Sequence, residues 1–250
     1  MPRSTRAAHA AALVLIASLS LAACGDTDTK APAGGAGAGA ESQSGRADLA
    51  QGTFADKVFG AIEDAGSAQI HFESGSGGKK FIGEGEVEYG DDLAVRMTMP
   101  NPAGGGGKQE MLLIGDTMYM GVGDRYMSMS LDTLRSSGMP DMSSNLDPKA
   151  QKKAFEAALT DFKQVGEPEQ IDGVQATPYE ITLDPSKAPE TFGTTTSEPL
   201  TFTYFVGPDN LPRKMTYKDK NGEFVVTYTD WGAPVDIKAP PADKITQGFG

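Results

Sequence analysis

The chain has 250 residues and a formal net charge of −12 at pH 7, with 34 acidic and 22 basic residues. This acidic balance argues against nucleic acid as a partner, and against binding to an anionic membrane surface by charge alone. The single cysteine excludes an intramolecular disulfide. After Leu21, no apolar stretch approaches the ~20 residues that a transmembrane helix needs.

The N-terminal residues have the layout of a secretory signal. Two arginines precede an apolar run that ends at Leu21, and small residues follow. The sequence Leu21-Ala22-Ala23-Cys24 matches the lipobox of bacterial lipoproteins, in which cleavage exposes a cysteine that receives a diacylglycerol group. We therefore predict a lipoprotein signal peptide at residues 1–23 and acylation of Cys24, with enough acyl chains for stable anchoring.

Residues 24–46 are rich in Gly, Ala and Ser and contain almost no large apolar side chain. This composition predicts a flexible tether. The remaining residues, 47–250, are numerous enough to bury one sizeable core, and we predict that they form a single domain.

Two amphipathic helices are predicted within this domain. Thr53, with Asp56 three residues later, is a helix start signal, and Gly66 ends the first helix. Asp147 caps the second helix and Pro148 occupies its first turn. The apolar face of this second helix is formed by residues at i, i+4 and i+7, namely Phe155, Leu159 and Phe162.

Most other segments alternate apolar and polar residues, as antiparallel strands with one buried face do. Examples are residues 81–89, 93–99, 176–183, 200–207, 212–219 and 224–231. Gly83 and Gly85 indicate bending or a close approach within the first of these strands. The pattern predicts an α+β fold, in which a curved antiparallel β-sheet has helices packed on one face.

Signatures of catalysis and metal binding are missing. His71 is the one histidine after the predicted signal, and alternation with Ile70 and Phe72 points it toward solvent. A zinc site needs three or four Cys, His or carboxylate ligands, and a histidine-based triad needs a nearby nucleophile and acid. We predict no catalytic residue, no metal site and no cofactor, and therefore no enzyme.

Nine of the eleven methionines lie between Met97 and Met142. A copper site is disfavoured because no His or Cys lies nearby, which leaves an ordinary core or a deformable apolar pocket. Register decides the arrangement. If the segment GVGD closes a hairpin with an even number of loop residues and places Tyr119 opposite Tyr126, one face holds Met118, Met120, Met127 and Met129. A three-residue loop would instead put Tyr126 beside Met118 and Met120.

Five stretches carry a family resemblance: the lipobox, FADKVFGAIEDAGS (54–67), IGDTMYM (114–120), DGVQATPYEITLD (172–184) and VTYTDWGAPVDIKAPPAD (226–243). The last, with Asp230-Trp231-Gly232, is the most specific. Together they resemble the LppX/LprG family of actinobacterial lipoproteins, whose domains look like the LolA/LolB lipoprotein carriers. The resemblance implies that residues 47–250 form a LolA-like lipid-binding domain, a half-barrel with helices packed on its concave face.

The resemblance also implies a function. We expect a lipid-anchored protein on the extracytoplasmic side of the cell membrane that binds acylated lipids or lipoglycans of the envelope and carries or presents them. It is expected to be a monomer, with an envelope transporter as a further partner. From strand alternation, the expected lining is Phe72, Val95, Met97, Met99, Met111, Leu113, Met118 and Met120, with Phe155 and Leu159 from the covering helix. The alternative is a structural or signalling lipoprotein with a filled core that acts through a protein partner.

Overall fold

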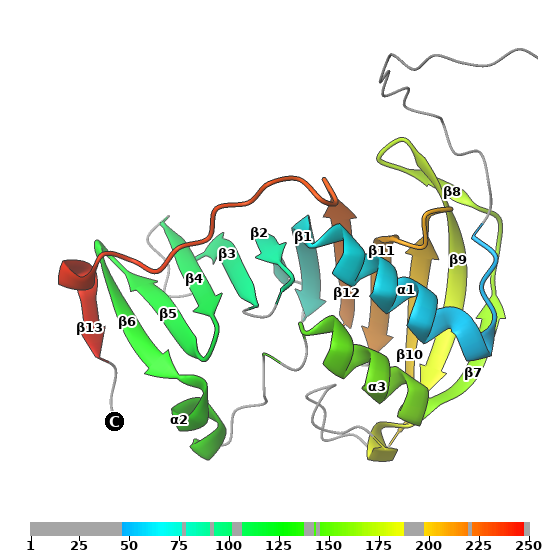
Figure 1. Cartoon of the computed structure of the whole chain (residues 1–250), viewed down its shortest axis with the longest axis horizontal. Coiled ribbons are helices and arrows are strands. Elements are labelled where there is room, and N and C mark those ends of the chain that lie inside the picture. Colours follow the sequence, from blue (N-terminus) through cyan, green and yellow to red (C-terminus); the bar gives the residue numbers. More distant parts are fainter. Residues whose placement is uncertain are drawn as a thin grey trace, which may run out of the picture. The chain divides into compact units, whose positions relative to one another are not determined.

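A single large sheet organises the described part of the chain (Figure 1). The computed structural model describes residues 47–76, 79–90, 93–101, 107–137, 143, 146–187, 198–219 and 222–247. All of them belong to one compact unit that spans residues 42–250. The predicted signal peptide, Cys24 and the tether lie outside the described residues.

The chain builds the sheet in two runs of strands. After α1 (Gln51–Ala65), the first run consists of β1 (Ser67–Ser76), β2 (Lys79–Glu88), β3 (Ala94–Pro100), β4 (Lys108–Ile114), β5 (Thr117–Val122) and β6 (Arg125–Ser130). Two helices follow, α2 (Leu131–Ser136) and α3 (Pro148–Ala158). The second run consists of β7 (Leu159–Gln164), β8 (Glu169–Ile171), β9 (Val174–Leu183), β10 (Leu200–Val206), β11 (Pro212–Asp219) and β12 (Gly222–Thr229). Short 3-10 helices are η1 (Pro185–Lys187) and η2 (Ala242–Lys244), and β13 (Ile245–Gln247) ends the described chain.

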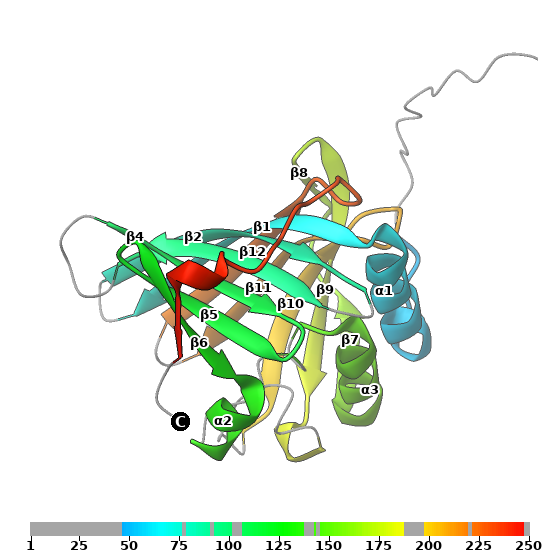
Figure 2. The same cartoon turned by 60° about the vertical axis from the view of Figure 1, so that its left-hand side comes forward.

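The two runs join in the middle of the sheet, where β1 pairs with β12. The strand order is β13-β6-β5-β4-β3-β2-β1-β12-β11-β10-β9-β7, and β8 pairs with β9 off this path. Neighbouring strands are antiparallel except β13 and β6, which are parallel. The predicted antiparallel sheet is therefore confirmed, and Figure 2 shows its curvature.

Helix α1 begins earlier than the sequence pattern predicts. Ala50 is its N-cap residue, and Thr53 lies in the first turn, where its hydroxyl oxygen accepts a hydrogen bond from the Ala50 N–H (3.3 Å). The prediction of Thr53 as the start was therefore wrong, because its side chain caps from inside the helix. The predicted end is confirmed, since Gly66 adopts a left-handed φ of 75° and its N–H donates to the Ile62 carbonyl.

Helix α3 begins as predicted but ends earlier. The Asp147 carboxylate accepts a hydrogen bond from the Lys149 N–H (2.9 Å), which caps the helix. The helix ends at Ala158, and Leu159 and Phe162 lie in β7 instead. Phe162 pairs opposite Ile181 of β9 and stacks on Tyr179. Tertiary packing thus overrides the helical spacing of these two residues.

Two hydrophobic clusters form most of the core. One lies under α1 and α3, where Phe54 contacts the rings of Phe155, Phe162 and Tyr204. The other lies around Val95, Leu113 and Met118 and is closed by Leu131 and Leu134 of α2. In Figure 1, α1 and α3 lie together over one end of the sheet, and α2 lies beside β6 near the other. Tyr89 and Trp231 pack against both clusters.

The opposite face of the sheet is polar along β2 and β3. Glu84 and Glu88 are exposed, and Arg96 forms ion pairs with Glu86 and Glu110. His71 lies on this face too, with 43% of its side chain exposed. The predicted solvated face is thus confirmed along β2, whereas Ala94 of β3 is buried with Leu112 and Ile237 in a third, smaller hydrophobic cluster.

Candidate functional site

The methionines share one face of the sheet. The β5–β6 hairpin has Val122 opposite Arg125, which leaves a two-residue loop. Met118 then lies opposite Met129, and Met120 opposite Met127, as an even loop predicts. Tyr119 pairs with Ser128 rather than with Tyr126. The predicted pairing of the two tyrosines was therefore wrong, because the observed register is shifted by two residues.

Part of this methionine face is solid core. Met118 is 4% exposed and packs with Leu113 and Val95, each 2% exposed or less. Helix α2 closes this end with Leu131 and Leu134. None of these five side chains borders the cavity described next.

A cavity of about 570 Å³ lies next to this packed end. Its size is typical of ligand sites in proteins. Helices α1 and α3 border it with Phe59, Ile62, Pro148, Gln151 and Phe155, and Leu146 precedes α3. Tyr89, which follows β2, also borders it. The sheet contributes side chains from β1 to β4 and from β10 to β12, namely Ile70, Phe72, Val87, Met97, Met99, Met111, Tyr204, Pro212, Met215, Phe224, Val226 and Tyr228.

The ten predicted lining residues divide into two equal groups. Those that border the cavity are Phe72, Met97, Met99, Met111 and Phe155. Those that do not are Val95, Leu113, Met118, Met120 and Leu159. The first four of the second group lie in or against the cluster under α2, and Leu159 packs against the cluster under α1 and α3. Whether any of the ten contacts a lipid remains a prediction.

Sequence reasoning missed the contribution of the C-terminal strands. Tyr204, Met215, Val226 and Tyr228 follow the alternation of β10, β11 and β12 and lie on the same face as Phe72. The alternation signal was present in the sequence. The pairing of β12 with β1, which brings these strands beside the methionines, could not be inferred from it.

Two glycines allow side chains of neighbouring strands to pack closely across β2. A Cβ atom at Gly83 would lie 2.1 Å from Phe72 Cζ, so the phenyl ring covers the glycine directly. At Gly85 it would lie 2.6 Å from the Arg96 carbonyl oxygen and 3.1 Å from side-chain atoms of Ile70 and Met97. The predicted close approach at these glycines is confirmed.

The Asp-Trp-Gly segment fixes one wall of the cavity. Asp230 and Gly232 adopt positive φ angles of 50° and 75°, and the Gly232 N–H donates to the Ser67 carbonyl (2.9 Å). The Trp231 indole donates to the Pro212 carbonyl (2.9 Å) and stacks on the rings of Tyr89 and Tyr228. The indole therefore holds two tyrosines that border the cavity.

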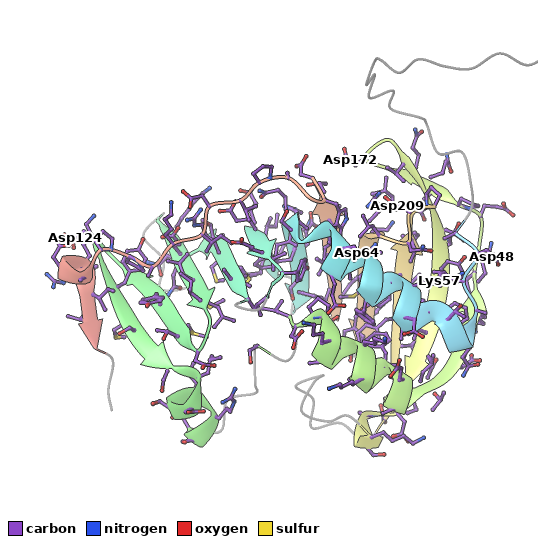
Figure 3. All side chains as sticks on the ribbon, viewed as in Figure 1. Asp48, Lys57, Asp64, Asp124, Asp172 and Asp209 are labelled. Carbon is purple, nitrogen blue, oxygen red and sulfur yellow. The ribbon has the colours of Figure 1, made fainter. Side chains whose placement is uncertain are left out.

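The lining is almost free of polar groups. Among the described residues, no charged side chain borders the cavity; its polar side chains are Gln151 and three tyrosines, Tyr89, Tyr204 and Tyr228. Charged residues labelled in Figure 3 lie elsewhere, such as Asp124 at the tip of the β5–β6 hairpin. Burial raises the pKa of Tyr228 to about 12 and also raises the pKa values of Tyr89 and Tyr204.

Within the described ranges, no group of three or more His, Cys, Asp or Glu side chains could hold a metal ion. None of the described helices is long and apolar enough to cross a membrane.

Comparisons with known proteins identify the fold. No protein-family model matches the sequence, and no curated protein matches it. Among solved structures, LprF from Mycobacterium bovis is 16% identical with a TM-score of 0.57, and the match covers 76% of this chain and 96% of LprF. The Mycobacterium tuberculosis lipoprotein LppX is 16% identical with a TM-score of 0.58, and the match covers 77% of this chain and all of LppX. The chain therefore has the fold of these two mycobacterial proteins, and the predicted resemblance is confirmed for the fold.

Proposed function

We propose that the protein binds acylated envelope lipids or lipoglycans in this cavity and carries or presents them without catalysis. The observation that carries the proposal is the cavity of about 570 Å³ with apolar walls and no charged side chain among the described residues. The shared fold with LprF and with LppX, which is a lipoprotein by name, supports it.

Such a cavity would lower the free-energy barrier to moving an acyl chain between membranes or binding partners. Moving a 16-carbon chain through water costs on the order of 12 kcal/mol, at about 0.8 kcal/mol per CH₂. A cavity that surrounds the chain with apolar side chains removes most of this barrier. No nucleophile or cofactor is needed for this role.

The N-terminal residues would attach the protein to the membrane. We place the protein in the LppX/LprG family, with a lipoprotein signal peptide at 1–23, an acylated Cys24, a tether to residue 46 and a LolA-like domain at 47–250. Helices α1 and α3 would then cover the concave face of a half-barrel. The protein would act as a monomer at the extracytoplasmic side of the cell membrane, with an envelope transporter as a further partner.

A second candidate rests on the packed end of the methionine face. Met118 and Leu113 are buried in solid core, as expected for a structural or signalling lipoprotein that acts through a protein partner. The cavity beside this core favours the lipid-binding role.

Native mass spectrometry tests the proposal. The segment 42–250 contains every described helix and strand, both main core clusters and the cavity, so it is the unit to produce in a lipid-containing bacterial host. We expect acylated molecules to co-purify with it. A segment that carries none, and that takes up none from phospholipid vesicles, would contradict the proposal and favour the second candidate.

A matched pair of variants localises the binding. Met99 borders the cavity, whereas Ile82 is an exposed apolar residue on the opposite face of the neighbouring strand. Met99→Glu should abolish lipid uptake because it places a carboxylate at the wall of an apolar cavity where, among the described residues, no cation can pair with it. Ile82→Glu adds the same charge and should leave uptake unchanged.

A further inference from the structure

Three tyrosines from distant parts of the chain meet at the cavity. Tyr89 follows β2, Tyr204 lies in β10 and Tyr228 lies in β12, and all three border the cavity. Within the described part of the chain, none of their hydroxyl groups has a hydrogen-bond partner. The buried Tyr179 differs, because its hydroxyl donates to the Ala47 carbonyl oxygen.

The rings of these tyrosines are held in place by packing. Those of Tyr89 and Tyr228 stack on Trp231, with centroid distances of 6.2 and 5.6 Å. The Tyr204 ring packs edge-on against Phe54 and Phe155, at 5.6 and 5.9 Å. Aromatic packing therefore fixes the rings, whereas the hydroxyl groups have no structural partner.

Within the described residues, the fully buried side-chain atoms without a partner are Thr177 Oγ1 and Arg213 Nη1, so the three tyrosine hydroxyls are open to the cavity. Phenylalanine would supply the same aromatic surface without a polar group. The hydroxyl groups also remain donors, since burial raises all three pKa values, and the neighbouring Tyr228 raises those of Tyr89 and Tyr204 further. Three such donors at one otherwise apolar cavity are placed to bind an acceptor on a ligand.

The acceptor must be uncharged. Among the described residues, no Lys, Arg or His borders the cavity, so a carboxylate or phosphate drawn inside would lose its hydration without gaining a cation. An ester carbonyl oxygen accepts hydrogen bonds and carries no net charge.

We propose that Tyr89, Tyr204 and Tyr228 form a polar subsite that donates hydrogen bonds to an ester carbonyl of the bound acyl lipid. This inference rests on the proposed lipid-binding function and adds a specific requirement, namely that the linkage between acyl chain and head group enters the cavity. A charged head group would stay outside.

Two probes of equal length separate this subsite from apolar binding in general. Labelled methyl hexadecanoate contains one ester, and labelled octadecane has the same number of chain atoms without one. Each is supplied to the segment 42–250 from phosphatidylcholine vesicles, and the ratio of bound ester to bound alkane is measured. In the triple variant Tyr89→Phe, Tyr204→Phe, Tyr228→Phe we expect this ratio to fall about tenfold, because a net hydrogen bond changes affinity by roughly that factor.

Tyr179→Phe is the matched control. It removes a buried hydroxyl that does not border the cavity, so it should lower the thermal unfolding midpoint and leave the ratio unchanged. The triple variant should unfold no earlier than the unaltered segment, since it removes hydroxyls that have no partner.

The outcomes distinguish the two proposals. If neither probe binds to the unaltered segment, the lipid-binding function fails. If both bind and the ratio in the triple variant stays within about twofold of the original, the polar subsite is refuted while lipid binding stands. A loss of the ester preference in Tyr179→Phe alone would also overturn the subsite.

Discussion

Replacing Gly83 with alanine is expected to push the Phe72 ring into the cavity. The two residues lie opposite each other on β2 and β1, and the added methyl carbon would lie 2.1 Å from Phe72 Cζ and 2.7 Å from each Cε atom. Non-bonded carbon atoms pack at about 3.5–4.0 Å, so the ring must move by more than ~1 Å. Phe72 borders the cavity, which is the space into which the ring can turn.

The stability cost should be moderate because a side chain moves rather than the backbone. Overpacking costs about 1–3 kcal/mol, and a domain of this size loses ~2–4 °C of Tm per kcal/mol. We therefore expect the Tm of Gly83→Ala to fall by about 2–12 °C, and its uptake of methyl hexadecanoate from vesicles to decrease. Circular dichroism during heating gives the first quantity, and the bound label gives the second.

A double-mutant cycle with Phe72→Ala isolates the contact. Without the ring, the methyl group at Gly83 meets no obstacle, and the destabilisation by Gly83→Ala should largely disappear. Gly85→Ala is the matched control, because its Cβ would lie 2.6 Å from the Arg96 carbonyl oxygen, which Phe72→Ala does not relieve. If Gly83→Ala costs the same with and without the ring, the steric explanation is wrong.

Further predictions concern the packed core and Tyr228. Leu113→Ala should lower the free energy of unfolding in urea by about 2–5 kcal/mol, and Met111→Ala by less, because only Leu113 is enclosed on all sides. Met118→Glu should unfold the segment, as seen by loss of the near-ultraviolet circular dichroism signal, since it places an unpaired carboxylate in solid core. A folded Met118→Glu variant that only loses lipid uptake would contradict the assignment of this residue to the core. Burial raises the pKa of Tyr228 from 10.0 to about 12, so above about pH 10 the unfolded chain releases a proton that the folded chain retains, and stability falls as pH rises. Urea unfolding at about pH 9 and pH 11 should show this decrease, and Tyr228→Phe should reduce it.

The inner face of the sheet could be predicted because strand alternation is a local property. Met97, Met99 and Met111 lie on one face in the sequence pattern and in the structure. Whether side chains of another element pack over this face depends on α2, which is distant in the sequence. Helix α2 has six residues, too few to give a periodic pattern, and yet its two leucines convert the region around Met118 into solid core.

Helix ends were less predictable than helix existence. The Leu159 and Phe162 spacing fits a helix, but the same two residues fit a strand that pairs with β9. The pairing of β7 with β9 decides between helix and strand for these two residues. This pairing is a long-range contact that the local sequence does not encode. The capping residue Asp147 and the terminal Gly66 were predictable because their roles depend on the adjacent backbone alone.

The cavity follows from a mismatch between the sheet and its helices. In the described part of the chain, twelve strands follow one another along the sheet, which at ~4.8 Å per strand makes an arc of about 50 Å. Helix α1 has 15 residues and α3 has 11, so their lengths are about 22 and 16 Å. They fill one end and α2 fills the other, which leaves apolar side chains of the middle strands without a covering helix. Exposing this surface costs about 25 cal/mol for each Å², and a ligand that covers it recovers that free energy, so occupancy of the cavity and stability of the fold are linked.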